Sequence, residues 1–89
     1  MHQLKLTSRA QRELDKLSVK DLERVAEVLQ KLADNPRPPG TRKLRGQIHR
    51  IRVGDWRIIY AILDRENIVL IGKIARRSKD IYNGLNDLF

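Results

Sequence analysis

Residues 50–60 decide the fold, and they read RIRVGDWRIIY. Charged and apolar side chains alternate with a period of two around Gly54-Asp55, as they do in half-buried β-strands. A two-residue loop with glycine at its first central position is typical of a type II′ hairpin turn. The stretch therefore predicts a β-hairpin in which Arg52 faces Arg57 across the ladder.

This hairpin collects positive charge on one face, because Arg50 lies two residues from Arg52 on the same side of its strand. Like charges directly opposite each other destabilise a sheet by a fraction of a kcal/mol. A solvated face of a basic protein would tolerate that cost. Three guanidinium groups on one face nevertheless favour an anionic ligand, and we expect phosphate.

The first third of the chain predicts one strand and two helices. Residues 2–7 alternate and are typical of a short strand. Ser8-x-x-Gln11 has the form of a capping box that opens a helix. Ser18 can cap a second helix, which Asn35-Pro36 stops. Because the two helices are adjacent, we expect an antiparallel helical hairpin.

Three strand-like runs follow the proline-rich loop, at residues 47–53, 56–63 and 68–74. Residues 64–67 form a turn between the last two. The order predicts an α+β fold, in which a helical hairpin packs on one face of a small antiparallel sheet (β-α-α-β-β-β) and leaves a basic open face. No repeat or linker divides the chain, so we expect a single domain over residues 1–89.

The composition narrows the class of partner. The chain has 89 residues, a net charge of +8 and no cysteine. Such a basic balance favours nucleic acid or a strongly acidic protein, and between Arg37 and Arg57 the one acidic residue is Asp55. No apolar stretch approaches the ~20 residues of a membrane span, and the N-terminus lacks a signal-peptide pattern. We expect a cytoplasmic protein with no membrane partner.

Several chemistries find no support in the sequence. His2 and His49 are not spaced as metal ligands, and no pair of acidic residues in the strand region suggests a two-metal nuclease. Glycine-rich phosphate loops and nucleophile elbows are absent. His49 is the one conventional general base near the arginines, but its parity turns it with Ile51 toward the helices. We therefore expect a structural role for His49 and no cofactor or metal.

A second group of chemistry-bearing residues follows the last strand: Arg76, Arg77, Lys79 and Tyr82. Tyr82 could stack on a base, a contact worth ~1–3 kcal/mol, or could pack the C-terminal segment on the sheet. Arginines and a tyrosine can cut RNA without a metal, because the 2′-OH beside each phosphate is the nucleophile. Arginine suits the stabilisation of the phosphorane, through bidentate contacts to phosphoryl oxygens.

The chain resembles the RelE/ParE superfamily of bacterial and archaeal type II toxins over almost its whole length. The resemblance rests on Asn35-Pro36, on residues 43–46 (KLRG), on residues 50–60 and on residues 76–82. Members of the RelE-like branch cut messenger RNA in the ribosomal A site, whereas members of the ParE-like branch poison DNA gyrase without nuclease activity. The central block alone does not separate the two branches.

The basic residues favour the RelE-like branch. The resemblance implies a catalytic set of Arg52, Arg57, Arg76 and Tyr82, and RNA contacts from Lys43, Arg45, Arg50, Arg77 and Lys79. In that set Arg57 clamps the phosphate, Arg76 acts as general acid or charge stabiliser, and Tyr82 stacks on a base. Arg52 stands at the position that resembles the proposed proton acceptor, where the well-known RelE enzyme has a lysine, and a guanidinium with a pKa above ~12 hardly ever loses its proton.

The expected function is therefore that of a type II toxin, a metal-independent endoribonuclease that cleaves messenger RNA in the A site of the 70S ribosome. The resemblance also implies an acidic, RelB-like cognate antitoxin that folds over the toxin surface. One alternative is a ParE-like inhibitor of DNA gyrase. Another is a degenerate toxin that only binds its antitoxin.

Overall fold

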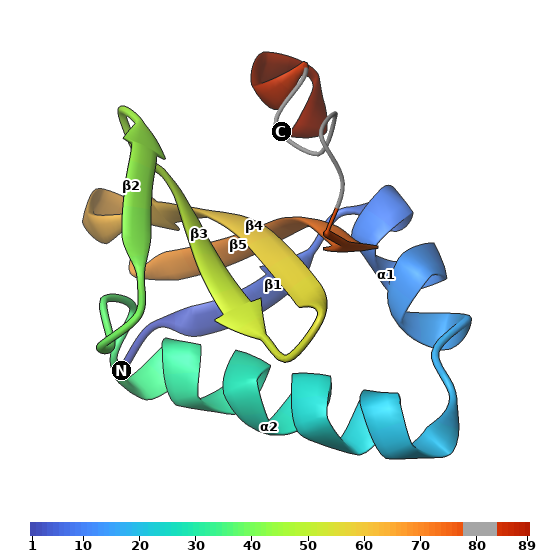
Figure 1. Cartoon of the computed structure of the whole chain (residues 1–89). Helices are drawn as coiled ribbons and strands as arrows, with labels where there is room; N and C mark the ends of the chain where they lie inside the picture. Colours follow the sequence, from blue (N-terminus) through green and yellow to red (C-terminus); the bar gives the residue numbers. More distant parts are fainter. Residues whose placement is uncertain (78–83) are drawn as a thin grey trace.

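The computed structural model describes residues 1–77 and 84–89, except for the side chains of residues 86 and 87. The predicted Lys79 and Tyr82 lie outside the described residues. In this part of the chain, two α-helices and a five-stranded sheet make up the fold (Figure 1). In chain order the elements are β1 (Gln3–Leu6), α1 (Ser8–Asp15), α2 (Val19–Asp34), β2 (Arg42–Arg45), β3 (Ile48–Val53), β4 (Trp56–Leu63), the 3₁₀ turn η1 (Asp64–Glu66), β5 (Ile68–Arg76) and η2 (Leu85–Leu88).

Hydroxyl side chains begin both helices. Thr7 is extended, and its Oγ1 accepts a hydrogen bond from the Ala10 amide at 3.1 Å. The capping residue of α1 is therefore Thr7, and the predicted capping box at Ser8 is wrong by one position. Ser18 caps α2 as predicted, by accepting from the Asp21 amide at 3.3 Å. The second helix ends at Asp34, because Asn35 precedes a proline and takes an extended conformation.

The sheet has the strand order β1-β5-β4-β3-β2. The β1–β5 pair is parallel and the other three pairs are antiparallel, which confirms the α+β prediction. Strand β2 was not predicted, because RKLR offers one apolar residue among three cations. It lies at the sheet edge, where basic side chains discourage pairing with another chain. Within the described residues, no helix is long and apolar enough to cross a membrane.

The central hairpin has the predicted register. Arg52 pairs with Arg57, and Val53 pairs with Trp56. Gly54 has a φ of +59°, whereas Asp55 has no positive φ. Positive φ at the first central residue alone is the signature of a type II′ turn, which confirms the turn expected from Gly54-Asp55.

The main core lies between the sheet and the two helices, and Figure 1 shows α2 running along one face of the sheet. Ile58 and Tyr60 of β4 are fully buried there, together with Val25 and Leu32 of α2. Along β3 and β4, the core residues alternate with the hairpin arginines. The helix-covered face therefore determines which side the arginines occupy.

Tyr60 joins the proline-rich loop to this core. Its hydroxyl donates to the Pro36 carbonyl at 2.7 Å and lies 3.1 Å from Thr41 Oγ1. The ring of His49 stacks on Tyr60 with centroids 5.9 Å apart, and His49 Nδ1 lies 2.8 Å from the Gln47 carbonyl. His49 therefore has the structural position expected for it. Burial lowers its pKa below the ordinary value of 6.5, because the charged imidazolium is disfavoured.

A smaller apolar cluster covers part of the opposite face. Ile59 and Leu88 are buried in it, and η2 lies across the sheet from α2 (Figure 1). Gly72 permits this approach, since a Cβ at that position would lie 2.5 Å from the Phe89 ring. The predicted open face is thus basic but partly covered by the C-terminal residues.

Candidate nucleic-acid interface

Cross-strand pairing places five cations on the sheet face opposite α2. In one row, Arg42 of β2 pairs with Arg50 of β3, and the row continues to Lys73 of β5. In the adjacent row, Arg52 of β3 pairs with Arg57 of β4. We call these five residues the cationic face. Each row opens with two like charges directly opposite each other, an arrangement that by itself costs stability.

Two arginines of the cationic face are buried, which corrects the expectation that the hairpin arginines face solvent or a ligand. Arg50 is 4% exposed and Arg57 is 7% exposed, whereas Arg52 is exposed. The C-terminal cluster around Leu88 lies on the same side of the sheet. A cation with little access to water interacts more strongly with a bound anion than an exposed cation does.

The turn of the hairpin holds the guanidinium of Arg57. Its Nη1 donates to the carbonyls of Gly54 and Trp56, both at 3.0 Å. These acceptors are neutral, and within the described part of the chain no carboxylate forms an ion pair with Arg52 or Arg57. The positive charge of this row is therefore not cancelled by carboxylates of those residues. A bound phosphate would neutralise this positive charge.

Arg76 is not brought to the cationic face. It pairs with Trp56 in the ladder, and its guanidinium carbon lies 4.8 Å from the centroid of the Trp56 ring. Since Trp56 packs against the helix-side core, Arg76 lies on the face opposite Arg57, at the end of β5. Arg77 is exposed, and its amide donates to the Asp55 carbonyl at 2.9 Å.

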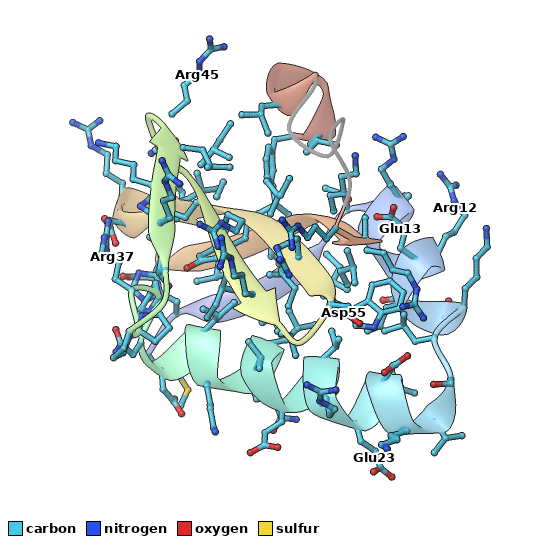
Figure 2. The ribbon with its side chains drawn as sticks, in the orientation of Figure 1. Arg12, Glu13, Glu23, Arg37, Arg45 and Asp55 are labelled. Carbon is cyan, nitrogen blue, oxygen red and sulfur yellow. The ribbon has the colours of Figure 1, made fainter. Side chains whose placement is uncertain are left out.

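Lys43 and Arg45 lie on the edge strand β2, and both are exposed. Arg45 is at the tip of this strand and points away from the sheet (Figure 2). Two members of the cationic face, Arg42 and Lys73, were missed by sequence reasoning. The signal for Lys73 was present, because it is the one charged residue within the apolar run 68–74. Arg42 could be placed only once β2 was known.

A cavity of about 320 Å³ lies beside the cationic face. Its lining comes from β2, β3 and η2, and we call it the edge pocket: Arg42, Lys43, Leu44, Arg50 and Leu85. A larger and more apolar cavity of about 460 Å³ is lined by residues including Ile48, Leu70 and Phe89. Of these two cavities, the edge pocket has the lining that suits an anion.

The chemistry available on the cationic face is electrostatic. His49 stacks on Tyr60 and belongs to the helix-covered side. Among the described residues, no three His, Cys, Asp or Glu side chains are placed to hold a metal ion. The face can therefore bind phosphoryl oxygens and stabilise developing negative charge.

Comparisons with known proteins agree with this description. The family model of the ParE toxin of type II toxin–antitoxin systems matches residues 4–81. A protein of Methanocaldococcus jannaschii, provisionally named toxin RelE1, is 29% identical over 79 residues, which are 83% of this chain and 88% of that relative. Both findings confirm the RelE/ParE resemblance.

Solved structures show the same fold. The archaeal RelE–RelB complex from Pyrococcus horikoshii matches with a TM-score of 0.80 and 25% identity, over 88% of this chain and 97% of that one. The RelBE2 toxin–antitoxin complex of Mycobacterium tuberculosis matches with a TM-score of 0.75 and 28% identity, over 85% and 98%. The α+β architecture is therefore that of RelE-like toxins.

Proposed function

The chain belongs to the ParE toxin family of type II toxin–antitoxin systems, within the RelE/ParE superfamily, and because its basic residues suit the RelE-like branch we propose that it is a ribosome-dependent endoribonuclease. It cleaves messenger RNA in the A site by attack of the 2′-OH on the neighbouring phosphate. The products are a 2′,3′-cyclic phosphate and a 5′-hydroxyl, and the RNA supplies the nucleophile. The observation that supports this most is the Arg52–Arg57 row, which has no carboxylate partner among the described residues.

Arg57 is the proposed phosphate clamp. Two backbone carbonyls hold its Nη1, while Nε and Nη2 make no hydrogen bond within the described residues. Those two nitrogens lie on one edge of the guanidinium and can donate together to two phosphoryl oxygens. Since the turn fixes the group before substrate arrives, little reorganisation is needed when charge develops on the phosphorane.

Arg52 is assigned an electrostatic role. It is exposed and directly opposite Arg57, so it can contact the same phosphate from the solvent side. An arginine with a pKa above ~12 is hardly ever a free base. Water or ribosomal RNA therefore accepts the proton of the 2′-OH.

The proposal also assigns roles to residues outside this row. Arg76 is held over Trp56 by a cation–π contact, worth only ~0.5–1 kcal/mol at exposed sites, and must leave the ring to stabilise the departing oxygen. Tyr82 supplies a stacking surface for a base. RNA contacts are assigned to Lys43, Arg45, Arg50, Arg77 and Lys79.

An acidic RelB-like antitoxin is the proposed partner in the cell. The similar archaeal and mycobacterial toxins are seen in complexes with their antitoxins. A net charge of +8, with five cations on one face of the sheet, suits an acidic partner.

Growth of cells that express the protein tests the proposal. Arg57→Ala removes the clamp, and loss of one preorganised donor costs ~10²–10³ in rate. We expect this variant to permit growth that the wild type arrests. Arg12→Ala is the matched control, because Arg12 is exposed on α1 and points away from the sheet (Figure 2). If Arg57→Ala is expressed at the same level and remains as toxic as Arg12→Ala, the proposal is wrong.

A second candidate function is inhibition of DNA gyrase, which the match to the ParE toxin model favours. A supercoiling assay with purified protein separates the two candidates. Trapped gyrase–DNA complexes, together with intact messenger RNA, would establish the gyrase function. If the protein neither traps gyrase on DNA nor cleaves messenger RNA, it is a toxin that only binds its antitoxin.

A further inference from the structure

The edge pocket combines a buried cation with apolar walls. Arg50 is 4% exposed and forms part of its lining, and Arg42 lies directly opposite Arg50 in the β2–β3 ladder. Leu44 and Leu85 complete the lining, and both pack against the smaller apolar cluster. A ligand for this pocket must be anionic at one end and apolar at the other.

We propose that the edge pocket binds one nucleotide of single-stranded RNA, next to the nucleotide whose phosphate lies at Arg57. The phosphate contacts Arg42 and Arg50, and the base lies against Leu44 and Leu85. This inference rests on the proposed function and specifies how the RNA strand crosses the toxin.

The spacing of the two rows supports this path. Arg50 and Arg52 lie two residues apart on one strand, a separation of about 7 Å along β3. That separation is comparable with the distance between successive phosphates of an extended RNA strand. A strand that places one phosphate at Arg52 and Arg57 can therefore place its neighbour at Arg42 and Arg50. The RNA then runs obliquely, along β3 and toward the edge strand β2.

The size of the pocket indicates one unpaired nucleotide. Its volume of about 320 Å³ lies at the small end of ligand sites, which span ~300–1,000 Å³. A base can reach Leu44 and Leu85 only when it is not paired in a duplex, because its face must contact the protein. Hydrocarbon walls accept any base, so we expect little preference among bases at this position.

Titration of the purified chain with a 2′-O-methyl RNA trinucleotide tests the proposal. The methyl groups block the nucleophile, so binding is measured without cleavage. We expect Arg42→Ala to weaken binding at least tenfold. The matched control Arg12→Ala removes the same charge from α1, and we expect a change of less than twofold.

The salt dependence provides a readout that a merely structural role would not alter. Loss of one phosphate contact should reduce the slope of log K against log salt by ~0.7 for a single strand. Backbone amide shifts at residues 42–44, 50 and 85 should follow the titration. Inorganic phosphate should shift residues 42 and 50 at higher concentration, whereas an unphosphorylated nucleoside should not.

Equal binding by Arg42→Ala and Arg12→Ala would overturn the proposal, and so would amide shifts confined to other parts of the chain. The outcome is separable from that for the proposed function. If the wild type binds the trinucleotide in the edge pocket but cuts no messenger RNA, the nucleotide site stands and the nuclease proposal fails. If the wild type cuts messenger RNA while Arg42→Ala binds the trinucleotide normally, the nuclease proposal stands and the nucleotide site in the edge pocket fails.

Discussion

At the scale of single residues, the helix-covered side of the hairpin supports the side that carries the cations. Tyr60 and His49 stack within the core and hold the proline-rich loop through Pro36. The same strands present Arg50 and Arg57 on the opposite side. Alternate residues of one strand point to opposite faces of the sheet. A substitution at His49 therefore affects the cationic face by shifting the strand backbone, not by direct side-chain contact.

Stability should fall in mild acid because of His49. Burial holds its folded-state pKa below 6.5, so the unfolded chain binds a proton first as pH falls. The free energy of unfolding therefore decreases as pH drops from 6.5 through the lower folded-state pKa. Above pH 6.5, His49 is neutral in both states and causes no loss of stability. Urea denaturation at pH 7.5 and 5.5 measures this loss.

His49→Phe keeps a ring against Tyr60 and cannot titrate. We expect its free energy of unfolding to change less between the two pH values than that of the wild type. Equal pH dependence in both proteins would show that other groups are responsible.

At the scale of elements, α1 completes the hydrogen bonding of β5. Strand β1 pairs with β5 only as far as Ile71. Beyond that point, Glu13 of α1 accepts the Ile74 amide with its Oε1 at 3.0 Å. The Glu13 side chain thus accepts a hydrogen bond from a β5 amide that β1 is too short to pair with.

Glu13→Ala should destabilise the fold by ~1–3 kcal/mol, since it leaves a backbone N–H without its acceptor. The matched control is Glu23→Ala, because Glu23 is exposed on α2 and points away from the sheet (Figure 2). Its effect should stay within ~0.5 kcal/mol. Thermal or urea unfolding provides the comparison, and similar losses in both variants would contradict the role of Glu13.

The junction between β5 and the C-terminal residues also belongs to this scale. Gly72→Ala places a methyl group 2.5 Å from the present position of the Phe89 ring. We expect a loss of ~1–3 kcal/mol from this overpacking, and increased hydrogen exchange at Leu88. Adding Phe89→Ala should recover part of the loss, because it removes the shortest contact and leaves Leu88 Cβ at 3.2 Å. A double variant less stable than Gly72→Ala would argue against this packing.

At the scale of the whole molecule, periodicity and turn chemistry predicted the two helices, the strand alternation and the face of Arg50, Arg52 and Arg57. The edge strand β2 could not be predicted, because residues 42–45 are extended through their pairing with β3 and lack the alternation of apolar and polar residues typical of a strand. The position of Arg76 opposite Trp56 depends on two residues by which β5 exceeds the predicted strand. The close packing of Phe89 against Gly72 is likewise indicated by no local pattern.

The most direct test of the central claim is the addition of purified protein to 70S ribosomes that translate a defined message. If the cationic face clamps the scissile phosphate, the wild type yields fragments with 2′,3′-cyclic phosphate ends at A-site codons. Arg57→Ala should yield at least a hundredfold less, a loss typical of removing one preorganised donor. Intact message with the wild type, or undiminished cleavage by Arg57→Ala, would contradict the account.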